Sequence, residues 1–391
     1  MDPDIPVAYA SVQVMAPPRD PLQELTKGRS HRLVVPQEQG LKMLADHDMR
    51  TLQDQGFTRG MIKAISRNNL NFPLRIWVVD NSGSMSTGDG NRLIETKSTQ
   101  HVKLVSCSRW TELVETVDYH CQMAALFEIA TAFRLLNDPG KMAGEQQFSI
   151  GERGPELIQE DLNAARSTMR SAQPQGVTPL ARHIFEIREN ITQMRDELRA
   201  SGRKVVVVLA TDGLPTDAYG YSGEPAREEF ESALRSLEGL PVWIVIRLCT
   251  DEDSVVDYYN ALDSNLELSL EVLDDFISEA KEVTEHNTWL NYGLPLHRIR
   301  EMGFSHRLFD LLDERKLSVD ELRDFMFLLF GEDNFDGIPD PQVDWKGFCD
   351  TISVVVHSEK KQWNPVTKKM DFWVDMRKLK KAYSKDGCFI M

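Results

Sequence analysis

Short apolar runs alternate with longer amphipathic stretches through the middle of this chain. Near-continuous Val, Ile and Leu runs are typical of parallel strands covered on both faces, and they occupy residues 74–79, 204–210 and 242–248. The pattern between and after them predicts helices near 111–129, 155–169, 179–200, 225–238 and 253–263. Shorter strands are predicted at 131–136 and 146–150, which could form an edge pair, and a last strand at 266–273. This alternation predicts an α/β fold with a doubly wound, mostly parallel, Rossmann-like sheet over residues 71–290.

The pattern changes on either side of this region. Residues 1–70 are proline-punctuated and predicted to be an irregular extension, with one helix over 39–53. Residues 291–358 are predicted to be a small helical module, in which Ser318 and Glu321 form a capping box ahead of the helix 322–330. Residues 359–391 are interpreted as a basic tail.

Charge separates that tail from the rest of the chain. The net charge is -16, yet residues 360–391 carry nine Lys or Arg against three Asp, a net +6 that leaves -22 elsewhere. An acidic body argues against nucleic acid as a partner, because nucleic-acid binding needs a basic surface.

The cysteines and the N-terminus indicate an intracellular setting. The five cysteines, Cys107, Cys121, Cys249, Cys349 and Cys388, are scattered without a C-x-x-C pair, which favours reduced thiols over disulfides or a zinc site. The N-terminus lacks a signal-peptide pattern, Gly is absent at position 2, and no apolar stretch is long enough to span a membrane. We therefore expect a cytoplasmic protein.

Oxygen-bearing side chains follow two of the predicted strands. Asp80, Ser82 and Ser84 form a D-x-S-x-S motif after residues 74–79, and Asp212 follows residues 204–210. Thr178 precedes a predicted helix. Ligands of doubly wound sheets bind beyond the carboxyl ends of the strands, and Mg²⁺ (or Mn²⁺) prefers hard oxygen ligands. The hydroxyls of Ser82, Ser84 and Thr178 would ligate the ion, while Asp80 and Asp212 would hold it through water and hydrogen bonds.

This set of residues resembles the metal-ion-dependent adhesion site of the von Willebrand factor A domain, over about residues 72–275. The resemblance implies a Mg²⁺-dependent binding domain in which an acidic side chain of a protein partner completes the coordination. A purely structural interpretation stays open, since N-S-G-S is a turn sequence, Thr178 before Pro179 is a helix N-cap and Asp212-Gly213 is a turn dipeptide.

Two segments border the predicted site. Residues 87–108 are longer than this family pattern requires, and we expect them to lie over the metal face and restrict access. Residues 214–224, with Tyr219 and Tyr221, are either a partner-reading loop or an ordinary mobile surface loop.

The last four residues, Cys388 to Met391, form a C-a-a-X box, and Met at the final position favours farnesylation of Cys388. The basic run at 377–381 lies just upstream and would add attraction to an anionic membrane face. The sequence therefore predicts a peripheral protein on the cytoplasmic face of a membrane; the alternative is a solvated tail with a free cysteine.

The helical module contains a degenerate EF-hand-like pattern. Asp310, Glu314, Ser318 and Glu321 match four loop positions, but Leu312 and Arg315 break the pattern. We expect helical packing or partner binding here and no calcium site.

The favoured function is a non-enzymatic, metal-dependent protein-binding module tethered by prenylation. The alternatives are a soluble assembly subunit without a lipid anchor and a Mg²⁺-dependent hydrolase, for which His183 is a candidate base. No phosphate-binding loop, H-E-x-x-H or G-x-S-x-G motif supports the enzyme.

Overall fold

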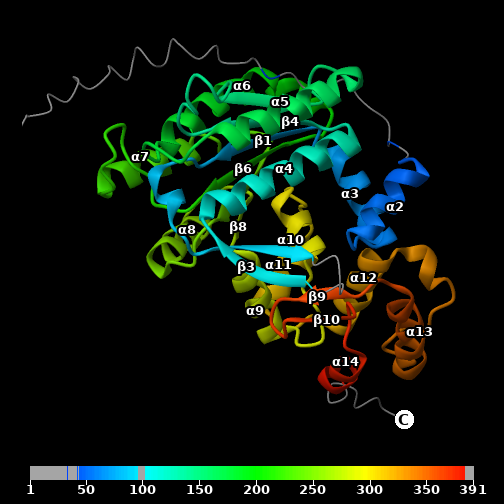
Figure 1. Ribbon diagram of the computed structural model, residues 1–391. Helices are drawn as coiled ribbons and strands as arrows, with labels where there is room; N and C mark the ends of the chain where they lie inside the picture. The colour runs from blue at the N-terminus through cyan, green and yellow to red at the C-terminus, as the bar shows by residue number, and fades with distance from the viewer. Residues whose placement is uncertain (1–32, 34–41, 43, 96–101, 384–391) are drawn as a thin grey trace, which may run out of the picture. The chain divides into compact units, whose positions relative to one another are not determined.

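The central feature is a six-stranded sheet, seen in a computed structural model that describes Leu33, Lys42 and residues 44–95 and 102–383 (Figure 1). The strands lie in the order β5-β4-β1-β6-β7-β8, and every neighbouring pair is parallel except β4 and β5. Their bounds are β1 Leu74–Val79, β4 Ala130–Leu135, β5 Gln147–Ile150, β6 Val205–Thr211, β7 Val242–Leu248 and β8 Leu270–Leu273. The predicted α/β class with a mostly parallel sheet is therefore confirmed, and the arrangement is compatible with a Rossmann-like fold. The last strand is shorter than predicted, since it starts at Leu270 rather than at residue 266.

Helices cover both faces of the sheet. On one face, Trp77 and Val79 of β1 pack with α4 (Arg109–Phe127) and α5 (Ile158–Ser171). On the other face, Ile76 and Val78 pack with α6 (Leu180–Ala200), α7 (Glu224–Arg235) and α8 (Asp253–Asn265). Successive side chains of a strand point to opposite faces, so a strand covered on both sides needs a nearly unbroken apolar run. The run 74–79 supplies it, and its one charged residue, Arg75, donates to the buried carbonyl of Met302.

A second hydrophobic core joins segments that are far apart in the sequence. The N-terminal segment folds into α2 (Asp46–Asp54) and α3 (Arg59–Asn71), which bury Leu52, Met61 and Ile65 against the C-terminal helices. Those helices are α9 Phe276–His286, α10 Leu294–Glu301, α11 Arg307–Glu314, α12 Val319–Phe330, α13 Trp345–Ser358 and α14 Met376–Tyr383. Residues 45–71 are thus not the irregular extension that the sequence predicted: α2 starts later than residue 39, and α3 was not predicted at all.

The close approach of two glycines fixes how α3 packs. A Cβ added to Gly60 would lie 2.3 Å from the backbone nitrogen of Gly331, just after α12. Only a residue without a side chain allows this contact between the two backbones.

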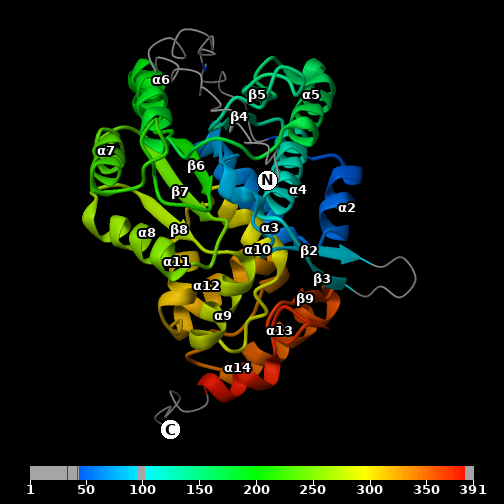
Figure 2. The same ribbon diagram turned by 60° about the vertical axis from the view of Figure 1, so that its left-hand side comes forward.

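The segment after the first site strand forms a β-hairpin. β2 (Gly90–Glu95) and β3 (Val102–Cys107) pair antiparallel, and residues 96–101 lie outside the described part (Figure 2). The backbone N–H of Arg109 donates to Thr87 O at 2.9 Å and closes the root of the hairpin. The described part of the long insertion is therefore a hairpin that is hydrogen-bonded to the first turns of α4.

The C-terminal segment is folded further along than the sequence predicted. β9 (Gln362–Asn364), β10 (Lys369–Asp371) and α14 bring Trp373, Leu379 and Tyr383 into the second core. The basic residues Arg377, Lys378, Lys380 and Lys381 are exposed on α14. The predicted lipidation site, Cys388, lies outside the described residues.

The EF-hand-like pattern falls on a helix pair whose geometry does not make a calcium loop. Asp310 and Glu314 lie within α11, whereas loop ligands would have to leave the helix. Glu321 completes the predicted capping box with Ser318 and also accepts two hydrogen bonds from Arg315. This segment therefore connects two helices of the second core.

Candidate metal centre

Asp80 and Asp212 lie together beyond neighbouring strands. β1 leads to β4 on one side, and the chain later returns to β6 on the other side, so the strand order reverses between β1 and β6. Asp80 follows β1, Asp212 follows β6, and the Asp80 N–H donates to Ala210 O at 2.9 Å. Both carboxylates are therefore at the switch point, the place where doubly wound sheets bind ligands.

The Asp80 carboxylate is buried and held on both oxygens. Its Oδ1 accepts the backbone N–H of Ser82 at 2.8 Å, and its Oδ2 accepts the Thr211 hydroxyl at 2.6 Å. Burial, and next the nearby charge of Asp212, raise the pKa of Asp80 to about 6. Two buried acids this close are costly as a pair of anions unless a cation shares the site.

The two serines place their hydroxyls side by side. Ser82 and Ser84 flank the start of a 3₁₀ turn, η1 (Gly83–Ser86), and their Oγ atoms lie 3.0 Å apart. Ser84 also donates to Asp212 Oδ1 at 2.7 Å. Ligands about 2.1 Å from Mg²⁺ on adjacent octahedral positions are about 3.0 Å apart, so the hydroxyl spacing fits the ion. Because Ser84 donates its one hydroxyl proton to Asp212, Ser82 is the donor in the contact between the two serines, and one lone pair of Ser84 remains for an ion. The hydrogen bond from Ser84 gives Asp212 the outer role that the sequence predicted.

Backbone contacts bring the Thr178 segment to this motif. Gly83 N–H donates to Gly176 O at 3.3 Å, and Gln175 N–H donates to Asn81 O at 2.7 Å. Asn137 links the two segments, because its N–H donates to Asn81 Oδ1 and its side-chain amide donates to Val177 O. Thr178 is buried. The sequence pattern did not single out Asn81 or Asn137 for this linking role.

Arg109 is a charged residue at this site that the sequence pattern also did not single out. Its Nη1 donates to Asp212 Oδ2 at 2.9 Å, so the two Asp212 oxygens have different partners. Its other nitrogens donate to both carboxylate oxygens of Asp89, at 2.7 and 2.5 Å. In the sequence, Arg109 is simply an arginine near the start of a helix. Its contact with Asp212 arises only from the tertiary fold.

The loop after β6 is ordered beside Thr178. Thr216 N–H donates to Thr178 O at 3.0 Å, and the Thr216 hydroxyl accepts the Thr178 N–H at 3.0 Å. Asp217 Oδ1 accepts the backbone N–H groups of Tyr219 and Tyr221, whose side chains are 64% and 75% exposed. The loop that contacts Thr178 thus carries two exposed aromatic side chains.

His183, the candidate base of the enzyme alternative, points into the protein. It is buried, and its Nε2 contacts Leu136 O at 3.0 Å. Burial lowers the pKa of His183 well below its usual range, which leaves a neutral imidazole.

A second acidic cluster lies in the helical part. Carboxylate oxygens of Glu279, Glu282 and Asp313 come within 4.8 Å of one another, a spacing that a metal ion can use. Arg300 forms ion pairs with Glu279 and Asp313, so a guanidinium already lies among these acids.

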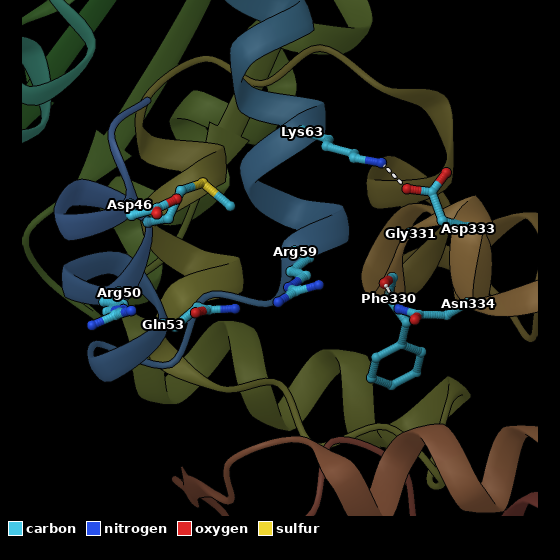
Figure 3. Close-up of a pocket in the computed structure, with 10 residues that line it drawn as sticks. Asp46, Arg50, Gln53, Arg59, Lys63, Phe330, Gly331, Asp333 and Asn334 are labelled. Atoms are coloured by element: carbon cyan, nitrogen blue, oxygen red, sulfur yellow. Dashed lines mark hydrogen bonds and ion pairs between the residues drawn. The ribbon is translucent and has the colours of Figure 1, made fainter. Parts of the chain in front are cut away.

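A pocket of about 440 Å³ opens between α2, α3 and the turn η3 (Glu332–Phe335) (Figure 3). Arg50, Arg59 and Lys63 line it together with Asp46 and Asp333, and Lys63 is ion-paired with Asp333. Its lining is mixed in charge, and the arginines are exposed.

Cys107, Cys121, Cys249 and Cys349 are free thiols, as expected, and Cys388 is outside the described residues. In the part of the chain that the structure describes, no helix has both the length and the apolar character to cross a bilayer.

The fold and the site define an α/β protein with hydroxyl and carboxylate oxygens grouped at the switch point of its sheet. A scan against protein-family models and a search of curated proteins found no match. Similar solved structures include the PilB minor pilin from Streptococcus sanguinis, with 13% identity and a TM-score of 0.31 over 52% of this chain and 57% of that chain. A point mutant of the same pilin has 14% identity and a TM-score of 0.34, over 51% of this chain and 56% of that chain. The chain thus spans little more than half the length of these proteins.

Proposed function

We propose that this protein is a non-enzymatic, Mg²⁺-dependent protein-binding module of the von Willebrand factor A type. The observation that carries the proposal is the grouping of the Ser82 and Ser84 hydroxyls with the buried acids Asp80 and Asp212 at the switch point. Thr178 is the third hydroxyl ligand in this proposal, and Mn²⁺ would substitute for Mg²⁺.

The residues present supply an incomplete coordination sphere. Three neutral hydroxyls leave most of the ion's charge unquenched, and Mg²⁺ takes six oxygens. When bound, the ion would offer its remaining positions to a carboxylate of a protein partner. Ser84 is exposed, so that side of the motif is accessible from solvent. The exposed Tyr219 and Tyr221 give the partner an aromatic rim, a residue type enriched in protein interfaces.

The second part of the proposal is a membrane tether. Farnesylation of Cys388 would give a weak anchor alone, and the exposed cations of α14 would strengthen it on an anionic cytoplasmic leaflet. The acidic remainder of the chain would face away from that surface.

The metal part is tested by affinity capture with the full chain as bait. Wild type in Mg²⁺, wild type in chelator and Asp80→Asn in Mg²⁺ are compared, with Glu267→Gln, an exposed acid remote in sequence from the motif, as the matched control. We expect a set of proteins to be lost with chelator and with Asp80→Asn but kept with Glu267→Gln. Capture that ignores both metal and Asp80 would exclude this mechanism.

The membrane part is tested by fractionating cells that express wild type or Cys388→Ser. We expect the variant to move to the soluble fraction. An unchanged distribution would favour the alternative of a soluble assembly subunit. Hydrolytic turnover that Asp80→Asn abolishes would instead favour a Mg²⁺-dependent hydrolase.

A further inference from the structure

Arg109 divides its guanidinium between the candidate metal centre and the root of the hairpin. Nε and Nη2 form a two-pronged contact with Asp89, and Nη1 reaches Asp212 Oδ2. Two parallel N–H donors on one carboxylate make the stronger and more directional kind of arginine contact. The arginine side chain is 10% exposed and that of Asp212 is 0% exposed, whereas that of Asp89 is 42% exposed.

The position of Arg109 couples two parts of the fold. Arg109 opens α4, its N–H donates to Thr87 O, and Asp89 immediately precedes β2. The next turn of α4 repeats the link, because Glu112 Oε2 accepts the backbone N–H of Asn91 in β2. If the hairpin shifted and moved Asp89 away, the guanidinium of Arg109 would lose one of its two carboxylate partners and keep only Asp212.

The two oxygens of Asp212 have separate roles. Oδ1 accepts from Ser84, whose hydroxyl belongs to the proposed ligand set, while Oδ2 accepts from Arg109. Asp80, Asp212 and Asp89 with Arg109 carry a net charge of -2 when all are ionised, the charge that one divalent ion neutralises. The positive charge of Arg109 also repels that ion, while Asp89 offsets part of the repulsion.

Building on the proposed function, we propose that Arg109 is a built-in counter-cation that limits the affinity of this site for a divalent ion. Asp89, at the root of the hairpin, restrains that effect by sharing the guanidinium. A shift of the hairpin that takes Asp89 away from Arg109 would leave the full charge of Arg109 on Asp212 and loosen the ion. By reciprocity, a bound ion favours the hairpin position in which Asp89 holds Arg109, so hairpin position and ion binding are linked through one arginine.

The test is Mn²⁺ binding, followed by the electron paramagnetic resonance signal of free Mn²⁺, with the full chain. Arg109→Gln should tighten binding about fivefold to tenfold, because it removes a charge but keeps a donor. Asp89→Asn should weaken binding about threefold to fivefold, because the guanidinium then acts on Asp212 alone. Arg92→Gln, in the same hairpin but paired with Glu115, is the matched control and should leave the affinity unchanged.

The opposite directions of the two effects distinguish regulation from simple support of the fold. If Arg109→Gln and Asp89→Asn both weaken Mn²⁺ binding, Arg109 only positions Asp212 and the inference is wrong. If Ser84→Ala abolishes binding but Arg109→Gln leaves it unchanged, the proposed metal site stands and this inference falls. If neither wild type nor Arg109→Gln binds Mn²⁺, both fall. Thermal melts of each variant verify that it is folded.

Discussion

Two buried acidic clusters in this protein use arginine in different ways. In the helical part, Arg300 lies among Glu271, Glu279 and Asp313 and donates to each of them. Its side chain is 2% exposed. At the switch point, Arg109 instead touches Asp212 from one side, and serine hydroxyls approach the other oxygen of that carboxylate.

The difference lies in which groups satisfy the acids. The Arg300 cluster is held together by its own guanidinium, so it is expected to stabilise the packing of α10 against α9 and α11. The Asp80 and Asp212 pair has hydroxyl neighbours spaced for a small cation and an exposed serine on its rim. A count of acidic residues would favour the Arg300 cluster as a metal site, with three acids against two; the placement of the arginine and the hydroxyls favours the switch point instead.

Removing each arginine should give the largest contrast in stability. Arg300→Gln removes the positive charge that lies among three acids. Removing one partner of a buried ion pair typically costs about 3–5 kcal/mol. Arg109→Gln should cost about 1–2 kcal/mol, because Asp89 is half-exposed and Ser84 still donates to Asp212. Urea unfolding measures both.

Magnesium sharpens that comparison. Addition of Mg²⁺ should stabilise Arg109→Gln by more than it stabilises wild type, because the ion site of this variant has lost a repelling charge. Arg300→Gln keeps the wild-type ion site, so Mg²⁺ should stabilise it only as much as wild type and leave its deficit in place. If Arg300→Gln does not fold near neutral pH, folding at about pH 5 should rescue it, since the raised pKa values of its partner acids favour their neutral forms there. If the two variants lost equal stability and responded equally to Mg²⁺, the two arginines would have the same role in their clusters.

The pH dependence of stability should report the Arg300 cluster. Burial raises the pKa of Glu271 to about 7, against the opposing effect of Arg300. A carboxyl whose pKa is higher in the folded state destabilises the protein progressively as pH rises from about 4.5 to 7. Relative to Glu271→Gln, which does not titrate, the wild type should lose about 3 kcal/mol over this range.

Urea unfolding at several pH values checks this, with the exposed Glu267→Gln as the matched control. The control should follow the wild-type profile. A constant difference between wild type and Glu271→Gln across the range would show that Glu271 does not titrate between these limits.

The sheet was predictable because its signal is local. Residues 74–79 and 205–211 are apolar runs that need cover on both faces, and Asp80 and Asp212 follow from the ends of those runs. The second core was less predictable, since the contact of Gly60 with Gly331 depends on two segments 271 positions apart. Trp373 and Tyr383 were likewise assigned to a basic tail, because the many lysines near them in the sequence indicate an exposed segment. The structure buries both aromatic residues in the second core.

The candidate site was predictable only in part. Its hydroxyl and carboxylate residues form a pattern readable along the chain, but Arg109 reaches an acid 103 positions away. An arginine at a helix start is usually solvated, so nothing local distinguishes it. The same holds for Asn137, whose amide contacts connect Asn81 to Val177.

A divalent ion should stabilise the protein through the switch-point cluster alone. At an ion concentration of about 100 times the dissociation constant, a site that exists only in the folded state adds about 2.7 kcal/mol. We expect Mg²⁺ to raise the melting temperature of wild type and of Glu282→Gln, but not of Ser84→Ala. Loss of the shift in Glu282→Gln would place the ion in the helical part instead.

The smallest effect on stability should come from the two exposed tyrosines of the loop that contacts Thr178. Tyr219 and Tyr221 are exposed, so replacing both with Ala should change the free energy of unfolding by about 0.5 kcal/mol or less. Their loop contacts Thr178 through backbone groups that the substitutions keep, so Mn²⁺ affinity should also stay the same. Mg²⁺-dependent capture of partners should fall about tenfold, because exposed aromatic residues next to an interface centre often carry much of its affinity. Unchanged capture would remove the loop from the proposed interface while leaving the metal centre in place.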